Sequence, residues 1–450
     1  MTLRAYLRQL LINNEVKRFA TEVDPDLELA AVCRREYLSA SGGDALFFEA
    51  VKGTSVQVAA NLFGSRARLL RMLEVDERGL TNKIRTMIAS GAHDALTNIT
   101  NASNTPPMDC SEPQYQHKEL ILNDIPALRS WPGEATRYLT LALTHSVSPV
   151  TGVSNLGLYR AALVGNEKIA LNFAPESGVA EHLKAAEDEG EALPVALILG
   201  ADPALLWAAA APLPAGCSEY GFAAAITGRG FTFTPCLSQP LKVPAGAEIV
   251  IEGHIKPGAT ISEGPFGNHT GQYVKREDCP LMEVTAIRHR HQPIIPITVV
   301  GPPPSENVQL AKLNELLLRE MLMFDFPLVA DLVMPEMTAF HGVAVIAVRP
   351  CSATEVADLI RQLGTVPSLS RSRLLVLVDD DINIHDFNLS WWRTLNLLDP
   401  ERVITAGKGL IINATGVDRG QLVTEDQATA DLVVNRHYQV SRETPECLQP

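Results

Sequence analysis

The sequence predicts an α/β protein of the α+β kind, with a small N-terminal α/β unit, a β-rich middle domain, a linking helix and a C-terminal α/β domain. Three observations support this prediction. The chain has 450 residues, more than one ordinary core holds, and its 46% hydrophobic and 20% charged residues suit a folded protein. Short apolar runs divided by Gly and Pro crowd its middle, and strand-like and helix-like segments alternate after it. We expect these parts at residues 1–105, 115–302, 303–325 and 326–450.

The N-terminal unit begins with apolar residues at helical spacing in residues 3–19, "LRAYLRQLLINNEVKRF". The acidic turn "VDPDLE" precedes a second helical pattern at 27–40, and apolar runs predict strands at 44–51 and 56–63. The stretch "TNASNTPPMDCSEP", residues 100–113, is rich in turn formers and predicts a linker. The N-terminal unit is therefore expected to be small and mixed α/β.

The middle region contains many short runs of β-branched and apolar residues. Gly and Pro separate these runs, as they separate the strands of barrels and sandwiches. The predicted strands are "RYLTLALTHSV" (137–147), "KIALNF" (168–173), "LPVALILG" (193–200), "GFTFTPCLS" (230–238), "AEIVIEGHI" (247–255), "MEVTAIRHR" (282–290) and "PIIPITVVG" (293–301). The pattern alone is compatible with either a barrel or a sandwich.

After the prolines of "VVGPPPSENVQ", Leu and Met recur every three or four residues in "NVQLAKLNELLLREMLM", residues 307–323. This stripe predicts a long helix whose apolar face packs in the core or at a subunit interface. The C-terminal region then alternates strand and helix patterns, which predicts a parallel sheet covered by helices. Its segments are "HGVAVIAVRP" (341–350), "SATEVADLIRQLG" (352–364), "RLLVLVDDDIN" (373–383), "LSWWRTLNLLD" (389–399) and "KGLIINAT" (408–415).

Charge and cysteine content argue against several classes of protein. With a net charge of -14 and a pI near 5.3, the chain lacks the clustered Lys and Arg of a nucleic-acid-binding surface. No run of about 20 apolar residues is present to span a bilayer, and the first residues lack the apolar core of a signal peptide. The seven cysteines are scattered without a CxxC pair, which fits reduced thiols. We therefore expect a cytoplasmic protein.

Polar residues gather in several turn-like stretches. In "SNLGLYRAAL", residues 154–163, Arg160 either clamps a carboxylate or phosphate through two hydrogen bonds or pairs with a surface acid. Glu219 in "CSEYGF" either caps the segment that follows or binds a hard cation. The acidic residues 379–381 end a predicted strand, where α/β sheets place ligands. Turn chemistry alone explains "ISEGPFGNHTGQY", residues 261–273, as a hydrated turn.

Taken together and in order, these motifs resemble the UbiD family of prenylated-FMN-dependent (de)carboxylases, which are similar to 3-octaprenyl-4-hydroxybenzoate decarboxylase. The set comprises "SNLGLYR", "LPVALILGADPALLWAAAAPLP", "CSEYGF", "KVPAGAEIVIEG", "SEGPFGNHTGQY" and "LVLVDDDIN", and the resemblance extends over residues 3–420. It is specific because several separated motifs agree. The resemblance implies a split β-barrel middle domain that binds prenylated FMN (prFMN), with the flavin phosphate held through a divalent ion.

The resemblance also implies which residues bind the cofactor and the metal. Asn155 and Glu219 match the family's ligands of a divalent ion, typically Mn2+, with K+ nearby. Further residues match positions that contact the flavin or its phosphate: Leu158, Tyr159, Arg160, Asn172, Phe173, Ala174, Ser177, Gly178, His269 and Lys408. A flavin prenyltransferase is then the expected supplier of the cofactor.

The family's catalytic set is an arginine and two acids, and this sequence keeps two of the three. Arg160 and Glu263 match the arginine and the first acid. Five positions after the first acid, where relatives carry Asp or Glu as proton donor, this chain has Asn268. An amide does not act as a general acid. Three explanations remain open: Glu263 or His269 donates the proton, a water held by Asn268 does so, or decarboxylation is lost.

A second departure lies in "APESGV", residues 174–179, where the family often has a His-Lys/Arg-Gly-Gly turn. Glu176 and Ser177 stand in place of the basic pair. The acid either alters ion binding near the flavin phosphate or faces solvent.

We therefore expect a prFMN-dependent enzyme that reversibly decarboxylates an aromatic, heteroaromatic or α,β-unsaturated carboxylic acid through a flavin–substrate adduct. CO2 is the expected small product, and the proton donor is expected to be altered. The alternatives are a cofactor-binding paralogue with a structural or regulatory role and no catalysis, and a metal-dependent hydrolase. We also expect a homodimer or larger homo-oligomer to which the linking helix contributes. The identity of the substrate stays open.

Overall fold

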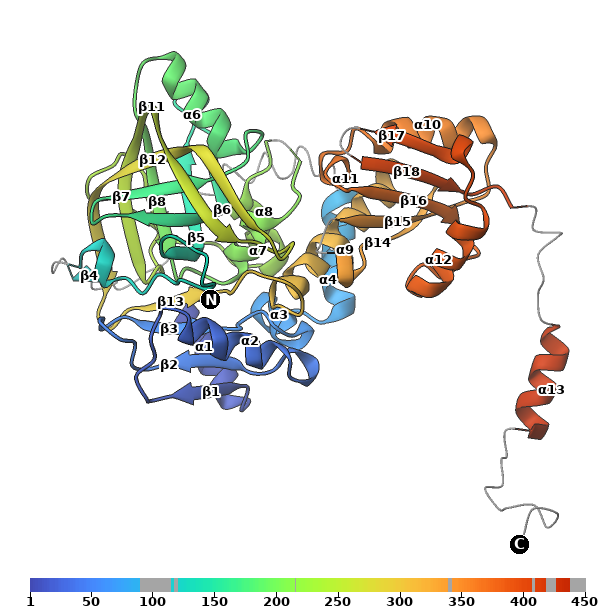
Figure 1. The fold of residues 1–450 in the computed structure, drawn as a ribbon, viewed down its shortest axis with the longest axis horizontal. Coiled ribbons are helices and arrows are strands. Elements are labelled where there is room, and N and C mark those ends of the chain that lie inside the picture. The colour runs from blue at the N-terminus through green and yellow to red at the C-terminus, as the bar shows by residue number, and fades with distance from the viewer. Residues whose placement is uncertain are drawn as a thin grey trace, which may run out of the picture.

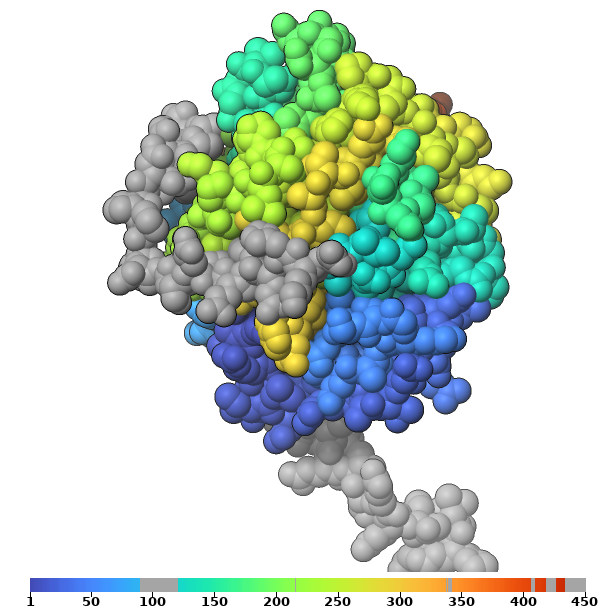
Figure 2. All heavy atoms as spheres, turned by 90° about the vertical axis from the view of Figure 1, so that its left-hand side faces the viewer, coloured from blue at the N-terminus to red at the C-terminus, as the bar shows by residue number. Residues whose placement is uncertain are grey.

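The structure is a computed structural model that describes residues 1–89, 115–116, 120–214, 216–338, 342–406, 409–417 and 426–437. A β-barrel lies on top of the N-terminal α/β unit, and helix α9 (Asn307–Asp325) leads from them to a separate C-terminal α/β domain (Figure 1). In the space-filling view, the N-terminal residues lie directly against the barrel (Figure 2). This arrangement confirms the predicted mixed α/β fold with a barrel in the middle.

The N-terminal unit is a four-stranded sheet with helices around it. The sheet order is β1 (Val16–Phe19), β2 (Ala45–Phe48), β3 (Gln57–Ala60) and β13 (Ile294–Ile297). Its helices are α1 (Leu3–Ile12), α2 (Glu28–Tyr37), the short 3-10 turn η1 (Ala40–Gly42), α3 (Arg66–Leu73) and α4 (Glu77–Ala89). Strand β13 pairs in parallel with β3, so the region expected as the middle domain contributes its last strand to the N-terminal sheet.

The first helix is shorter than the sequence pattern predicts. The apolar spacing over residues 3–19 predicts one helix, but α1 ends at Ile12 and β1 begins at Val16. The Asn13 side chain donates to the carbonyl of Gln9, and Asn14 adopts a left-handed conformation with φ 56°. Asn adopts this conformation more readily than most residues, so the pair ends the helix and turns the chain into the sheet.

The middle domain is a closed barrel, which resolves the choice between barrel and sandwich. Six strands close through the pairing of β11 with β12, and β4 (Tyr115–Gln116) adds to the outside of β12. The barrel strands are β5 (Tyr138–Val147), β6 (Ser154–Val164), β7 (Lys168–Asn172), β8 (Leu193–Leu199), β11 (Ile249–Gly267) and β12 (Tyr273–Arg290). The other elements of this region are η3 (Leu122–Asp124), α6 (Gly178–Asp188), α7 (Ala204–Ala210), α8 (Glu219–Thr227) and the hairpin strands β9 (Phe233–Pro235) and β10 (Lys242–Pro244).

The polar stretch 261–273 is largely strand, which corrects the expectation of a turn. Residues 261–267 belong to β11, and only residues 268–272 turn the chain into β12. The register of β11 against β12 shifts on both sides of Glu263. Such bulges re-aim side chains within a strand, so glycine and proline here bend a paired strand instead of forming a loop.

The C-terminal domain is a five-stranded sheet with a parallel centre. Its order is β14 (Val329–Val333), β15 (Val343–Val348), β16 (Leu374–Asp379), β18 (Gly409–Ala414) and β17 (Val403–Ala406). The three central strands are parallel, as the βαβ pattern predicts, whereas the two edge strands are antiparallel. The other elements are η4 (Glu336–Thr338), α10 (Ala353–Leu363), α11 (Pro367–Ser370), α12 (Phe387–Asn396), η5 (Pro400–Arg402) and α13 (Gln427–His437).

Helix α9 buries much of its apolar stripe in cores within the chain. Leu313 and Leu317 belong to the core that the N-terminal unit shares with the barrel, and Leu318 and Leu322 belong to the core of the C-terminal domain. The helix packs on α4 and on β14. Core packing, one of the two predicted uses for this stripe, is therefore observed. No helix in the described ranges is both long and apolar enough to cross a membrane.

Candidate active site

An arginine and a glutamate from two barrel strands form a paired cluster. Arg160 of β6 donates from Nε to Oε1 of Glu263 at 2.9 Å and from Nη2 to Oε2 at 2.7 Å. Asn172 of β7, the cross-strand neighbour of Arg160, donates from Nδ2 to Oε2 at 2.6 Å. The Glu263 side chain is 0% exposed, whereas that of Arg160 is 20% exposed. The guanidinium thus holds a buried carboxylate and keeps one side toward solvent.

Aromatic rings enclose this pair. The Arg160 guanidinium lies 4.4 Å from the centre of the Phe266 ring, and Phe266 packs edge-to-face on Tyr138 at 4.7 Å. The Tyr138 hydroxyl lies 3.3 Å from the carbonyl oxygen of Pro265. Burial, together with the charge of Glu263, raises the pKa of Tyr138. Tyr138 therefore stays neutral and contributes a hydroxyl and an apolar ring to the wall of the cluster.

Of the two expected metal ligands, Glu219 lies at the start of α8 and contacts β6 next to Asn155. Glu219 is the first residue of this helix, whose N-cap Ser218 accepts from the backbone N–H of Gly221 at 3.2 Å. The Glu219 carboxylate accepts from the backbone N–H of Leu156, the residue after Asn155, at 3.1 Å. Burial raises the pKa of Glu219 to about 7. The positive end of the helix and the Leu156 N–H favour the ionised carboxylate but offset only part of the effect of burial on this pKa.

The surroundings of Asn155 fit a bound group. Within the described part of the chain, the Asn155 Nδ2 atom is buried and has no hydrogen-bond partner. A Cβ at Gly178 would lie 2.2 Å from Asn155 Oδ1, so only glycine leaves room for this amide. An amide and a carboxylate are hard oxygen donors of the kind that Mg2+ or Mn2+ prefers. No group of three or more His, Cys, Asp and Glu suited to a metal occurs among the described residues, so such an ion would need further ligands from a bound molecule or water.

Tyr159, next to Arg160 on β6, directs its hydroxyl toward the region around Asn155. Its hydroxyl lies near the side chains of Ser177 and Asn155, and its ring packs edge-to-face on Phe173 at 5.7 Å. Burial raises the pKa of Tyr159, and the charge of Arg371 in the C-terminal domain opposes this shift. The C-terminal domain therefore brings a positive charge toward this end of the barrel.

The remaining expected cofactor contacts lie on the same strands and on the turn into α6. Leu158 is half-buried on β6, and Ala174 is exposed just after β7. The Ser177 hydroxyl donates to the carbonyl of Ala174 at 2.6 Å, which closes the turn before α6. Glu176 is exposed. Lys408 lies outside the described residues.

Asn268 stabilises the turn between β11 and β12. Its Oδ1 accepts from the backbone N–H of Thr270 at 2.9 Å and from the Thr270 hydroxyl at 2.6 Å. Its backbone N–H donates to the carbonyl of Gln272 at 3.0 Å. This is the local hydrogen bonding typical of Asn in turns. His269 follows it, half-buried, and takes part in interactions of its own.

The acidic cluster at the end of β16 is engaged in structural contacts. Arg393 pairs with Asp379 at 3.3 Å and with Asp381 at 3.2 Å. Asp379 also accepts from the backbone N–H groups of Gly416 and Val417. These contacts hold α12 and the end of β18 against the sheet, which argues against a hydrolytic metal centre here.

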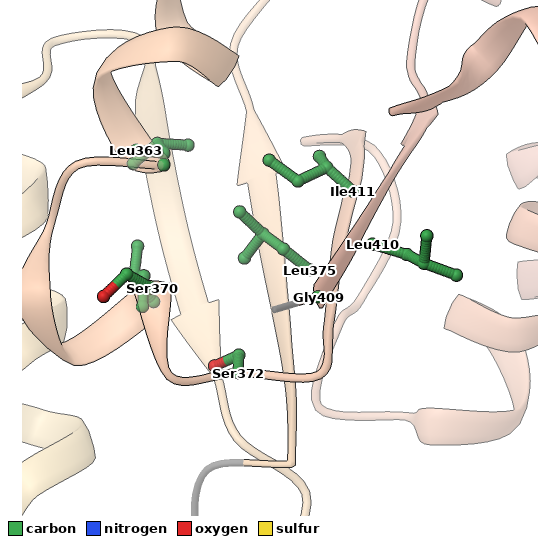
Figure 3. A pocket seen from close by; sticks show the side chains of 9 residues that line it. Leu363, Ser370, Ser372, Leu375, Gly409, Leu410 and Ile411 are labelled. Atoms are coloured by element: carbon green, nitrogen blue, oxygen red, sulfur yellow. The ribbon is translucent and has the colours of Figure 1, made fainter. Parts of the chain in front are cut away.

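Two cavities lie outside the Arg160–Glu263 cluster. The smaller, of about 10 Å3, lies among Leu363, Leu375 and Ile411 in the C-terminal domain (Figure 3) and has room for a single water. The larger, of about 590 Å3, lies where the N-terminal unit, residues 303–309 and η4 meet.

Sequence reasoning missed three buried polar residues near Asn155. His145 and Ser146 lie on β5, and His182 on α6. Ser146 Oγ lies 2.9 Å from His182 Nδ1, and the Tyr220 hydroxyl lies 3.3 Å from His145 Nδ1. The signal was present, because a histidine and a serine interrupt the otherwise apolar run "RYLTLALTHSV".

Comparison with known proteins agrees with this geometry. Three family descriptions match the chain: the 3-octaprenyl-4-hydroxybenzoate carboxy-lyase N-terminal domain over residues 7–88, its Rift-related domain over 101–303 and its C-terminal domain over 308–417. An uncharacterised protein of Archaeoglobus fulgidus is 33% identical over 409 residues, with 89% of this chain and 85% of that protein covered. One of Synechocystis is 32% identical over 421 residues, with 89% and 83% covered.

Solved structures share the fold over nearly the whole chain. The UbiD-class enzyme HmfF from Pelotomaculum thermopropionicum, in an evolved dimeric form with prFMN, is 27% identical with a TM-score of 0.76, covering 95% of this chain and 98% of that one. Vanillic acid decarboxylase of Sedimentibacter hydroxybenzoicus, in its closed form, has a TM-score of 0.82 at 24% identity, covering 97% and 98%, and supports the fold alone. With three matched domains in the expected order and a barrel that presents the Arg160–Glu263 pair, the chain belongs to the UbiD family of carboxy-lyases.

Proposed function

We propose that the protein is a prFMN-dependent decarboxylase acting reversibly on an aromatic, heteroaromatic or α,β-unsaturated carboxylic acid. The observation that carries this proposal is the buried Arg160–Glu263 pair, tied to Asn172 on adjoining strands of a flavin-type barrel. A UbiD-class relative with the same fold holds prFMN. A guanidinium that keeps one side toward solvent is suited to orient a substrate carboxylate through paired hydrogen bonds.

The residues around Asn155 would hold the cofactor. Asn155 and Glu219 would bind a divalent ion, Mn2+ in this proposal, with K+ nearby, and the ion would neutralise the flavin phosphate in an acidic protein. Tyr159, Phe173 and the other expected contacts from Leu158 to Gly178 would line the ring system, with His269 and Lys408 as further contacts. When bound, prFMN supplies the electron sink for loss of CO2. The protein supplies orientation and electrostatics.

The proton that replaces CO2 must come from a group other than Asn268. The Asn268 amide cannot serve as an acid, and its oxygen is engaged with Thr270. Glu263 is the acid nearest to the arginine that would orient the substrate, and His269 or a water at the turn are the other sources. We favour Glu263, which would take up a proton from solvent before passing it to the product, because it lies directly against the arginine that would orient the substrate.

A second function is favoured by Asn268 itself. The chain could bind the cofactor without turning over a substrate and serve as a structural or regulatory partner of an active paralogue. An amide at the donor position, engaged in holding a turn, is the feature expected of such a protein.

The two functions are separated by one experiment. The chain is produced together with a flavin prenyltransferase, and bound prFMN is followed by absorption in the near ultraviolet and visible. A panel of unsaturated and aromatic carboxylic acids is then scored for CO2 release and for H/D exchange into the decarboxylated products. Cofactor with turnover supports the decarboxylase, cofactor without turnover on any acid supports the non-catalytic partner, and a colourless protein contradicts both.

We also propose that the chain forms a homodimer or larger homo-oligomer. The relative that holds prFMN is described in a dimeric form. We keep the expectation that α9 contributes to this interface, because some of its residues pack within the chain while Phe324 is exposed. Sedimentation at micromolar concentration should show more than monomer.

A further inference from the structure

A buried histidine contacts the backbone of Asn155 and the side chain of Tyr220, the neighbour of Glu219. His145 on β5 is 3% exposed and is surrounded by the apolar core of the barrel. The Tyr220 ring packs edge-to-face on its imidazole at 5.7 Å, with the Tyr220 hydroxyl 3.3 Å from Nδ1. The backbone carbonyl of Asn155 is its second partner. Burial lowers the pKa of His145 to about 4, so the ring is neutral near pH 7.

Each of the two partners of this imidazole belongs to, or directly follows, one of the proposed metal ligands, Asn155 and Glu219. Asn155 is one ligand, and Tyr220 directly follows Glu219, the other, in the first turn of α8. A neutral imidazole donates from one nitrogen and accepts at the other. Assigning the Tyr220 hydroxyl as the donor to Nδ1 places the ring N–H on Nε2, the nitrogen then available to the Asn155 carbonyl. The imidazole therefore links β6 to α8 through one hydrogen bond to each.

We propose that His145 is a positioning residue that sets the separation of Asn155 and Glu219 and thereby the affinity for the divalent ion. This inference rests on the proposed cofactor site. Another hydrogen bond joins the two segments, from the Leu156 N–H to Glu219, but it acts on the carboxylate alone. Groups that orient metal ligands from behind typically change metal affinity by about 10–100-fold when removed.

His182 provides a matched control. It too is a buried imidazole with a hydroxyl partner, Ser146 Oγ at 2.9 Å. Its hydrogen bond to Ser146 joins α6 to β5 and does not reach α8. Replacement of His182 should therefore lower stability without a specific effect on the ion.

The test is a double-mutant cycle on His145 and Tyr220. His145→Gln keeps a donor near the Nε2 position and removes the acceptor at Nδ1, whereas Tyr220→Phe removes the hydroxyl. Both changes delete the same hydrogen bond. The readouts are FMN affinity, measured by flavin fluorescence with and without MnCl2, and the melting temperature of the apo-protein. His182→Gln is measured alongside, and Tyr220→Phe, which deletes one oxygen, carries the test should the histidine variants fail to fold.

We expect each single variant to lose about tenfold in Mn2+-dependent FMN affinity, and the double variant to lose about tenfold rather than a hundredfold, because coupled residues are not additive. FMN affinity without Mn2+ should be unchanged. The positioning role is overturned by any of three results. These are wild-type Mn2+ dependence of FMN affinity in both single variants, losses of FMN affinity that multiply in the double variant, and an equal loss of FMN affinity without Mn2+. If the wild-type protein itself shows no Mn2+-dependent FMN binding, the proposed metal site is wrong and this inference falls with it.

Discussion

At the residue scale, the buried carboxylate of Glu263 has hydrogen bonds to both of its oxygens from Arg160 and Asn172. Two guanidinium N–H groups and one amide N–H meet the two carboxylate oxygens within 2.9 Å. Breaking a buried pair by removing one partner is costly, typically about 3–5 kcal/mol, because the other charge is left without compensation. Retention of such a pair in the barrel of a carboxy-lyase fold is best explained by the need for a fixed cation beside an acid.

Removal of either charge should abolish turnover. We expect no measurable CO2 release from Glu263→Gln or Arg160→Ala on a substrate confirmed with the wild-type protein, because the first change removes the acid and the second removes the carboxylate clamp. Arg361→Ala, which removes an exposed pairing with Asp358 on α10, is the control and should remain active. Near-normal release by Glu263→Gln would show that another group supplies the proton.

Asn268→Asp should give equal or higher activity. Aspartate retains an oxygen that accepts from the Thr270 N–H and hydroxyl, so the turn is kept while an acid is restored at the donor position. Asn268→Ala lacks these bonds and should lose about 1 kcal/mol of unfolding free energy. Activity is measured as initial CO2 release and stability by denaturant unfolding. A stable Asn268→Asp protein with much lower activity would contradict the expectation.

At the element scale, α8 places a carboxyl group where the protein alone does not fully stabilise its charge. Glu219 lies in the first turn, which favours an acid, but burial dominates and raises its pKa to about 7. In the unfolded chain a glutamate titrates near its ordinary value of about 4.3. The folded apo-protein therefore binds this proton more tightly than the unfolded chain, and its stability falls as pH rises from about 4.3 to about 7.

Glu219→Gln should consequently stabilise the apo-protein and remove metal binding. At pH 8 without metal we expect a gain on the order of 3 kcal/mol from the pKa shift, shrinking at pH 5 and vanishing below the unfolded pKa. Glu219→Gln, like Glu219→Ala, should lose both flavin and metal, while the fold stays intact. Melting curves at the two pH values and flavin content measure both effects. Full flavin retention, or equal melting at pH 8, would contradict the assignment.

At the scale of the whole molecule, cores and domains do not coincide with segments of sequence. One buried cluster contains Phe63 and Leu69 of the N-terminal unit, Ile198 of the barrel and Leu313 of α9. The C-terminal domain has separate clusters, of which one contains Leu359. The N-terminal unit and the barrel are thus one packed body, joined further by β13, whereas the C-terminal domain has cores of its own.

The units that unfold cooperatively should therefore correspond to these cores. We expect two cooperative units in hydrogen exchange, one comprising the N-terminal unit with the barrel and the other the C-terminal domain. Leu313→Ala should lower protection in both the N-terminal unit and the barrel by about 2–5 kcal/mol, and Leu359→Ala should act on the C-terminal domain alone. Independent loss of protection in the barrel and the N-terminal unit would show that they are separate.

The sequence by itself determined most strands and the family, and it named the two residues, Arg160 and Glu263, that the structure pairs. Short apolar runs between turn-forming residues indicate buried strands, so β5, β8 and the central strands β15 and β16 of the C-terminal domain were predictable. Ordered motifs carried the resemblance, which named Arg160, Glu263, Asn155 and Glu219. The edge strands β14 and β17 and the early end of α1 were missed, because pairing partners and two asparagines overrode the local pattern.

Only the tertiary structure decided which distant groups meet. Glu263 lies 103 positions from Arg160 and 91 from Asn172, and their contacts follow from the register and bulges of β11, which periodicity does not encode. Closure of the barrel likewise brings His145 between Asn155 and Tyr220. Local sequence specifies which side chains are buried, but the hydrogen-bond partners of a buried polar group depend on strand order and register, and these are properties of the whole fold.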